Sequence, residues 1–328
     1  MARIKAIEYH FPARKVSNDP QNKLTKKIGI LTRYIAEEYE TASDLAIKAA
    51  EKLFEKDVCI KSEIDFLLFC TQAPDYILPT TACIIQEKLK LPTSCGALDF
   101  NLGCSGFVYG LSLAKGLIDS GQAKNILLLT ADTYSKFINE NDLSTAVLFG
   151  DAAAATIISE SSDNNDIGHF VFGTDGSGAE DLIIFSGGSK EPLNFETLLE
   201  VEDEKGNRRA RNNLYMNGPE VFNFAMREVP KAINELLNKE NTTLGNYDFF
   251  VFHQANKYML DALRRRIGID QEKFSIQLND SGNTVSSTIP IALKREIELG
   301  NVKKGDKVML VGFGVGLSWS VCSIKLCI

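Results

Sequence analysis

The chain has 328 residues, of which 44% are apolar and 24% are charged; this composition is typical of a globular protein and excludes disordered and collagen-like chains. Its formal net charge of −7 disfavours nucleic acid and anionic membrane surfaces as partners. No apolar run reaches the roughly 20 residues of a membrane span and the first residues lack the apolar core of a signal peptide, so we expect a cytoplasmic protein of about two domains.

Short apolar strands alternate with helices in the first half of the chain. Residues 64–69 form a continuous apolar run, which is typical of a strand buried on both faces of a sheet. The further elements expected in chain order are a helix at 79–89, a strand at 97–100, a helix at 106–118 and strands at 125–130 and 152–159. This alternation predicts helices packed on a mostly parallel sheet.

The second half of the chain repeats features of the first half. Asp65 and Asp248 each lie at the start of a similar apolar strand. Two further pairs recur in the same order and at nearly the same spacing along the chain, namely Ile126 with Val308 and Gly121 with Gly300. Three pairs of matching positions, in the same order and at nearly the same spacing, predict an internal duplication. One half would cover residues 1–168 and the other residues 169–328.

The offset places polar residues at equivalent turns of the two halves. Cys104 corresponds to Asn283 at the spacing of the glycine pair, and Cys70 corresponds to His253 at the spacing of the aspartate pair. Equivalent turns of a duplicated fold can converge on one site, so Cys104, His253 and Asn283 are candidate catalytic residues. Each also has a structural interpretation: a buried apolar thiol, a structural histidine and a turn or helix cap.

Cys104 lies in a turn rather than in a core pattern, because Gly103, Ser105 and Gly106 flank it. A helix is expected to begin directly after it. The unpaired N–H groups at a helix N-terminus lower the pKa of a thiol and bind a developing oxyanion. We therefore expect Cys104 to be a nucleophile with a lowered pKa. The other six cysteines form no C-x-x-C pair, which disfavours a disulfide framework and a zinc site.

Five segments carry a resemblance to a known family. They are 101–107 (NLGCSGF), 149–153 (FGDAA), 253–256 (HQAN), 281–284 (SGNT) and 312–319 (GFGVGLSW). Together they resemble the thiolase-fold condensing enzymes, and among these β-ketoacyl-acyl carrier protein synthase III. The resemblance implies an α/β chain with a duplicated thiolase-like fold, in five αβαβα layers with mixed, mostly parallel sheets. The half 1–168 would carry the nucleophilic cysteine, and the half 169–328 the histidine and the asparagine.

The resemblance also implies an acyltransferase of fatty acid biosynthesis that makes a β-ketoacyl thioester by decarboxylative Claisen condensation. Cys104 would take the acyl group from a thioester primer, and His253 and Asn283 would hold the carbonyl of malonyl-acyl carrier protein. The oxyanion would be held by the backbone N–H groups of Cys104 and Val315. The reaction would need no metal and no cofactor, because acyl-CoA or an acyl-carrier thioester is itself a substrate.

Two other classes of enzyme that use similar residues do not fit the sequence. Elongating synthases have a second histidine at the position of Asn283, and neither His10 nor His169 lies in such a motif. Papain-like proteases use Cys, His and Asn in the same chain order, but their cysteine context is absent and the duplicated pattern does not suit them. Two alternatives remain open. One is a specialised relative that transfers the acyl group to another acceptor in secondary or polysaccharide metabolism, and the other is a non-catalytic partner subunit.

The primer side of the expected site departs from the family pattern. Members that use CoA primers hold the adenine between a Trp and an Arg, and alignment places Lys23 and Leu143 at these positions. The only tryptophan, Trp319, belongs to the C-terminal strand. We therefore expect the primer to arrive on a carrier protein, or CoA to bind weakly.

The family also implies a homodimer in which a residue before a proline caps the acyl tunnel of the partner chain. That residue is Leu78 in this sequence, where a Phe is common, so we expect longer or branched primers to be accepted. Alternatively, Leu78 only packs at the interface. The other positions that align with the acyl pocket are Leu214, Met216, Phe222, Met259 and Phe313.

An acidic carrier protein needs a local basic patch on a chain of net charge −7. Lys257, Arg264, Arg265 and Arg266 lie on the helix expected after the candidate histidine, and they are the docking candidates. Such a run is also typical of a solvated helix face. The segment 200–211 carries charges of both signs and is expected to be an exposed loop.

Overall fold

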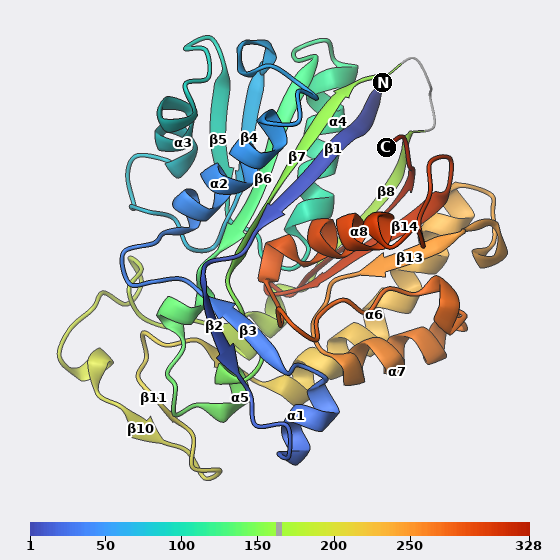
Figure 1. Cartoon of the computed structure of the whole chain (residues 1–328). Helices are drawn as coiled ribbons and strands as arrows, with labels where there is room; N and C mark the ends of the chain where they lie inside the picture. The colour runs from blue at the N-terminus through green and yellow to red at the C-terminus, as the bar shows by residue number, and fades with distance from the viewer. Residues whose placement is uncertain (162–165) are drawn as a thin grey trace.

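Two mixed β-sheets organise the chain in a computed structural model that describes residues 1–161 and 166–328 (Figure 1). The N-terminal sheet has the order β1-β7-β6-β4-β5. Its strands are β1 (Ala2–His10), β4 (Phe66–Cys70), β5 (Gly96–Phe100), β6 (Asn125–Asp132) and β7 (Ala152–Glu160). β4 is parallel to β5 and β6, whereas β7 is antiparallel to β6 and to β1. All strands of this sheet except β7 therefore point the same way.

The C-terminal sheet repeats this arrangement with the order β13-β14-β15-β8. Its strands are β8 (Ile167–Thr174), β13 (Phe249–Phe252), β14 (Lys307–Gly314) and β15 (Ser318–Lys325). β13 is parallel to β14, and β15 is antiparallel to both β14 and β8. β13, β14, β15 and β8 take the places of β4, β6, β7 and β1, respectively. A parallel bridge from Phe250 to Phe274 lies where the counterpart of β5 would be.

The duplication extends to individual hydrogen bonds. The Asp65 N–H donates to the Asn125 carbonyl and the Asp248 N–H donates to the Lys307 carbonyl, both at 2.9 Å. In return, the Asp65 carboxylate accepts the Asn125 N–H at 3.0 Å and the Asp248 carboxylate accepts the Lys307 N–H at 2.8 Å. Each aspartate thus ties the start of one strand to the start of its parallel neighbour, in the same way in both halves.

Helices fill three layers around the two sheets (Figure 1). α2 (Ala42–Phe54) and α3 (Thr81–Leu89) cover the N-terminal sheet, α4 (Gly106–Asp119) and α8 (Thr288–Glu298) lie between the sheets, and α6 (Gly218–Lys239) and α7 (Lys257–Ile267) cover the C-terminal sheet. Successive residues of β4 show this layering, because Leu67 and Phe69 pack on the outer helices and Leu68 packs in the middle layer. The five-layer, duplicated α/β fold expected from the sequence is confirmed.

The chain also has shorter elements, several of which gather at one end of the two sheets (Figure 1). The strand pairs are β2 (Arg14–Ser17) with β3 (Thr32–Ile35), β9 (Leu182–Ile183) with β12 (Tyr215–Met216), and β10 (Val201–Glu202) with β11 (Arg208–Arg209). The short helices are α1 (Lys23–Ile28), α5 (Leu143–Ala146) and the 3-10 turns η1 (Lys61–Glu63), η2 (Tyr134–Phe137), η3 (Gly176–Asp181), η4 (Glu196–Leu198), η5 (Leu244–Asn246), η6 (Gln271–Lys273) and η7 (Val285–Ser287). The segment 200–211, expected to be an exposed loop, is largely exposed and contains the short hairpin β10–β11. Among the described residues, no helix has the length and apolar character needed to span a membrane.

The two halves share their central core. The middle layer takes α4 from the first half and α8 from the second, and the apolar residues of both helices pack in one cluster. The predicted division into 1–168 and 169–328 falls at the start of β8, which begins at Ile167. Residues 162–165 lie outside the described residues, and the exact boundary stays a prediction.

Candidate active site

Cys104 lies in the turn between β5 and α4, directly against the end of β14. A Cβ atom at Gly314 would lie 2.7 Å from the Cys104 Cβ and 2.9 Å from its Sγ. A Cβ atom at Gly312 would lie 2.6 Å from the Ser105 Cα. Real Cβ atoms do not approach so closely, so only glycine at these positions lets β14 reach the cysteine turn. The two halves therefore meet at the expected nucleophile.

Two opposing influences act on the Cys104 thiol. Burial raises its pKa to about 12, and the Asp132 carboxylate adds to that shift. The backbone N–H groups of Cys104 and Val315 donate toward the sulfur and favour the thiolate, but they do not offset the burial. The expectation of a lowered thiol pKa is therefore wrong for the resting site. These are the two N–H groups that the family resemblance implies for the oxyanion hole.

His253 follows β13 and is buried, with only 2% of its surface exposed. Its Nδ1 lies 2.7 Å from the Thr288 Oγ1, and its ring packs edge-on against Phe313 with the centroids 5.5 Å apart. Burial lowers the pKa of His253 to about 3, so the imidazole is neutral near pH 7. Within the described part of the chain, no hydrogen bond joins this ring to the Cys104 sulfur.

Asn283 is held in place from both halves of the chain. Its backbone N–H donates to the Leu148 carbonyl at 2.9 Å, and its carbonyl accepts the Gly150 N–H at 3.0 Å. Its side-chain Oδ1 accepts the Val285 N–H at 2.9 Å, which leaves Nδ2 3.5 Å from the His253 Nε2. The structure thus brings His253 and Asn283 together.

Asp132 is a buried carboxyl near the site that the sequence analysis missed. It ends β6 and accepts hydrogen bonds from the Gln72 N–H at 2.8 Å and the Ser286 N–H at 3.2 Å, as well as from the Ser286 hydroxyl. Burial raises its pKa to about 7. It ties β6 of one half to η7 of the other. Only its place at the end of an apolar strand could have pointed to it.

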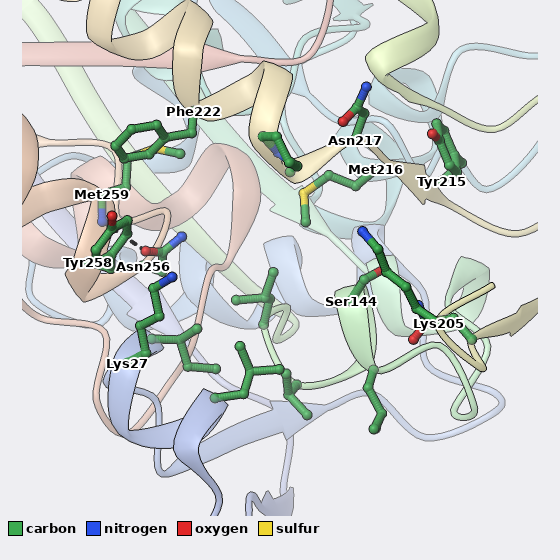
Figure 2. Close-up of a pocket in the computed structure, with 18 of the residues that line it drawn as sticks. Lys27, Ser144, Lys205, Tyr215, Met216, Asn217, Phe222, Asn256, Tyr258 and Met259 are labelled. Carbon is green, nitrogen blue, oxygen red and sulfur yellow. Dashed lines mark hydrogen bonds between the residues drawn. The ribbon is translucent and has the colours of Figure 1, made fainter. Parts of the chain in front are cut away.

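A cavity of about 1010 Å³ opens beside the site (Figure 2). Three of the predicted acyl-pocket residues, Met216, Phe222 and Met259, line it. Leu214 and Phe313 are buried in the adjacent core, whereas Leu78 is 83% exposed on a loop and does not line the cavity of its own chain. The catalytic candidates are not part of the lining.

The cavity wall nevertheless connects directly to the catalytic candidates. Leu148 lines the cavity, and its carbonyl holds the Asn283 N–H. Asn256 also lines it and follows closely after His253 in the chain, where it caps the start of α7 by accepting the Met259 N–H at 2.9 Å. The cavity therefore leads from the protein surface towards the turn that carries Asn283.

Basic side chains from separate elements line this cavity. Lys27 of α1 and Lys205 of the β10–β11 hairpin lie on opposite sides of it in Figure 2. Arg209 is neutralised by Asp142 at 2.7 Å and Asp203 at 2.6 Å. Neither of the two lysines forms an ion pair within the described residues; the Lys27 ammonium lies 4.2 Å from the centre of the Tyr258 ring.

The two positions aligned with the adenine clamp offer no aromatic or guanidinium group. Lys23 is exposed and Leu143 is a half-exposed residue of the cavity wall. One aromatic side chain of the cavity wall, Tyr258, stacks on Phe222 with the ring centroids 5.5 Å apart.

The predicted docking residues lie on α7 and differ in their freedom. Arg265 and Arg266 are exposed in the last turn of the helix. Arg264 is half-buried and donates from Nη1 to the Ile269 carbonyl at 3.0 Å, and Lys257 pairs with Asp261 at 2.6 Å. Arg265 and Arg266 are therefore the exposed cations of this set, and neither forms an ion pair within the described residues.

Comparisons with known proteins agree on one family. The family profile described as 3-Oxoacyl-[acyl-carrier-protein (ACP)] synthase III matches residues 98–176, and the profile of its C-terminal part matches residues 237–326. A Clostridium perfringens protein named beta-ketoacyl-[acyl-carrier-protein] synthase III is 39% identical over 300 residues, which are 92% of this chain and 89% of that protein. A crystal structure of a 3-oxoacyl-(acyl-carrier-protein) synthase III has a TM-score of 0.97 at 48% identity and covers 99% of both chains. A structure of a 3-oxoacyl-(acyl-carrier protein) synthase from Burkholderia xenovorans LB400 has a TM-score of 0.91 at 36% identity, over 99% of this chain and 94% of that one.

The high thiol pKa predicts how Cys104 reacts in the absence of substrate. Between about pH 7 and 9, its alkylation by iodoacetamide should accelerate about tenfold per pH unit, because the thiolate fraction rises in that proportion below the pKa. Timed labelling followed by peptide mass spectrometry measures the rate, with the exposed Cys83 as an internal reference. A Cys104 rate that becomes independent of pH within this range would contradict the raised pKa.

Proposed function

The chain belongs to the 3-oxoacyl-[acyl-carrier-protein] synthase III family, whose members are acyltransferases, and we propose that it condenses an acyl-thioester primer with malonyl-acyl carrier protein, releasing carbon dioxide. The observation that carries the proposal is the buried pair of His253 and Asn283, 3.5 Å apart, together with a cysteine sulfur that receives two backbone N–H groups. Such a site has one nucleophile and separate donors for two different oxyanions.

In the first half-reaction, the Cys104 sulfur attacks the carbonyl carbon of the primer thioester. A C–S bond to Cys104 forms, the bond to the departing thiol breaks, and the Cys104 proton leaves with the departing sulfur. The backbone N–H groups of Cys104 and Val315 stabilise the tetrahedral oxyanion, because they already donate toward the sulfur. The acyl group itself is carried by the thiol, so the step needs no cofactor.

In the second half-reaction, the malonyl carboxylate leaves as carbon dioxide and its bonding electrons form an enolate. Nitrogen donors of His253 and Asn283 stabilise the enolate oxygen, and the enolate carbon attacks the acyl group on Cys104. The C–S bond to Cys104 then breaks, and the thiolate takes a proton from water. A neutral, buried imidazole suits this role, since it polarises a carbonyl without bringing a charge into the site.

The relatives support condensation over the alternatives considered from the sequence. Curated proteins that are 34–39% identical over at least 92% of the chain are named beta-ketoacyl-[acyl-carrier-protein] synthase III. Transfer to another acceptor in specialised metabolism is therefore not favoured. The presence of Cys104, His253 and Asn283 together also disfavours a non-catalytic partner subunit.

We propose that the primer arrives as a phosphate-bearing thioester, most readily on a carrier protein. The unneutralised ammonium groups of Lys27 and Lys205 lie on opposite sides of the cavity and suit the phosphate of a phosphopantetheine arm (Figure 2). Lys23 and Leu143 occupy the positions aligned with the adenine clamp, and these two side chains cannot form an aromatic–guanidinium pair around an adenine. CoA donors should therefore bind more weakly than carrier-borne donors.

The two half-reactions should separate on mutation. Cys104→Ala should abolish acylation of the enzyme, whereas His253→Ala and Asn283→Ala should retain acylation and lose condensation by about 100-fold or more each, because they remove enolate donors. Intact-mass measurement detects the acyl-enzyme, and release of labelled carbon dioxide from malonyl-acyl carrier protein reports condensation.

The same assay, run with butyryl-carrier and butyryl-CoA, tests the donor. The proposed reaction fails if the acyl group forms on a residue other than Cys104, or if no carbon dioxide is released. Saturable acylation at micromolar butyryl-CoA would instead refute only the preference for a carrier-borne primer.

We also propose that an acidic acyl carrier protein docks on the last turn of α7. The double variant Arg265→Glu and Arg266→Glu should raise the KM for malonyl-acyl carrier protein about tenfold and leave acylation by a CoA donor unchanged, because only the carrier meets this surface. Lys304→Glu is the matched control, since this exposed lysine precedes β14, whose other end lies at Cys104. Equal KM values in the two variants would rule out docking at α7.

A homodimer is the last part of the proposal, and the loop that carries Leu78 supports it. Tyr76, Ile77 and Leu78 are consecutive, and Ile77 is 92% exposed. β5, which follows this loop and α3, lies at the edge of its sheet, and no described strand pairs with its outer side. Consecutive exposed apolar residues beside a free strand edge are typical of a protein interface. Leu78 would then reach the acyl tunnel of the partner.

Light scattering should give twice the chain mass of 36.2 kDa at assay concentrations. Leu78→Phe should reduce acylation by butyryl and longer donors relative to acetyl donors, because a larger side chain shortens the tunnel. A monomeric mass would exclude Leu78 as a cap on the acyl tunnel of a partner chain. An unchanged chain-length profile in a dimer would assign Leu78 to interface packing alone.

A further inference from the structure

Thr288, the first residue of α8, places its hydroxyl beside the ring of His253. The Thr288 Oγ1 lies 2.7 Å from the His253 Nδ1 and 3.0 Å from the Val285 carbonyl oxygen. The side chain is buried, so bulk water does not compete for these contacts. A hydroxyl has one proton and can donate to only one of the two partners, although it can accept at the same time.

Asn283 constrains the opposite side of the same ring. Its Oδ1 accepts the Val285 N–H at 2.9 Å, so the group that lies 3.5 Å from the His253 Nε2 is the Nδ2 amide, which can only donate. That contact is favourable only if Nε2 offers a lone pair. A neutral imidazole with a lone pair on Nε2 carries its proton on Nδ1.

We propose that Thr288 is a positioning residue that fixes the ring of His253 and sets its resting tautomer. Nδ1–H donates to the Thr288 hydroxyl, the hydroxyl donates to the Val285 carbonyl, and the Asn283 amide donates to Nε2. In this arrangement all three contacts are hydrogen bonds. The opposite tautomer turns Nε2–H towards another N–H donor and takes the hydroxyl proton away from Val285, so two of the three contacts are lost.

The tautomer matters because an enolate oxygen needs a proton on Nε2. When a substrate carbonyl lies between Asn283 and His253, the Asn283 amide no longer needs Nε2 as its acceptor. One proton then leaves Nδ1 to water and one proton from water joins Nε2, so the ring stays neutral. The Thr288 hydroxyl rotates from the Val285 carbonyl to Nδ1 and now donates. A hydroxyl serves both tautomers, whereas an apolar side chain of the same shape serves neither.

Nitrogen NMR of the full-length protein with labelled histidine tests the resting state directly. The chain has only three histidines, and His253→Gln identifies the signals of His253 by their loss. We expect a protonated Nδ1 and an unprotonated Nε2 in the resting enzyme and in Thr288→Ser. We expect Thr288→Val to lose this single tautomer and to show signals averaged between the two forms. A resting His253 with its proton on Nε2 would overturn the proposal.

Kinetics provide the second measurement and rest on the proposed function. Thr288→Val should slow carbon dioxide release from malonyl-acyl carrier protein about 10- to 100-fold and leave acylation of Cys104 unchanged, whereas Thr288→Ser should restore most of the loss. Thr130→Val is the matched control, because it removes a buried hydroxyl that bonds the Ser287 hydroxyl at 2.9 Å and, within the described residues, forms no hydrogen bond with His253.

The outcomes separate the two proposals. Slowing of both half-reactions to the same extent in Thr288→Val and Thr130→Val would reduce Thr288 to a structural residue and overturn the positioning role. If no variant, nor the wild type, condenses malonyl groups, the proposed function fails, while the NMR result still decides the tautomer.

Discussion

The contact between the Cys104 turn and the glycines of β14 is the constraint on which the site depends. Any side chain at Gly314 would overlap the Cys104 Cβ and Sγ, so β14 can reach the turn only as bare backbone. That approach brings the Val315 N–H to the sulfur and covers the thiol. It also places the two sheets on either side of α4 and α8, so one contact links the site to the five-layer core.

Burial then determines the electrostatics of the resting site. It raises the pKa of the Cys104 thiol and of the Asp132 carboxyl and lowers the pKa of His253, so each group is pushed towards its neutral form. Charge enters mainly with the substrate, as an oxyanion or an enolate. Fixed hydrogen-bond donors are effective for such charges because they need no reorganisation in a buried site of low dielectric constant.

Much of this could be predicted from the sequence, because duplication leaves a regular offset. The offset pairs Asp65 with Asp248, whose hydrogen bonds match. It also brings His253 and Asn283 into one hypothesis, and their side chains lie 3.5 Å apart in the structure. It could not predict the direction of the Cys104 pKa shift, since that depends on how deeply the turn is covered. It also missed Asp132 and Thr288, whose partners Ser286 and His253 lie 154 and 35 residues away along the chain.

The sequence by itself determined the class of the fold and the three residues of the catalytic hypothesis, because apolar periodicity, turn residues and internal repetition are local or regular patterns. The family followed from the resemblance of five short segments, among them 101–107 and 312–319. Only the tertiary structure decided that the Cys104 thiol is buried and that Nε2 of His253 faces Asn283. It also decided that the hairpin β10–β11 brings Lys205 to the cavity. These properties arise from contacts between segments far apart in the chain. Burial and hydrogen-bond direction belong to such contacts and not to any residue alone.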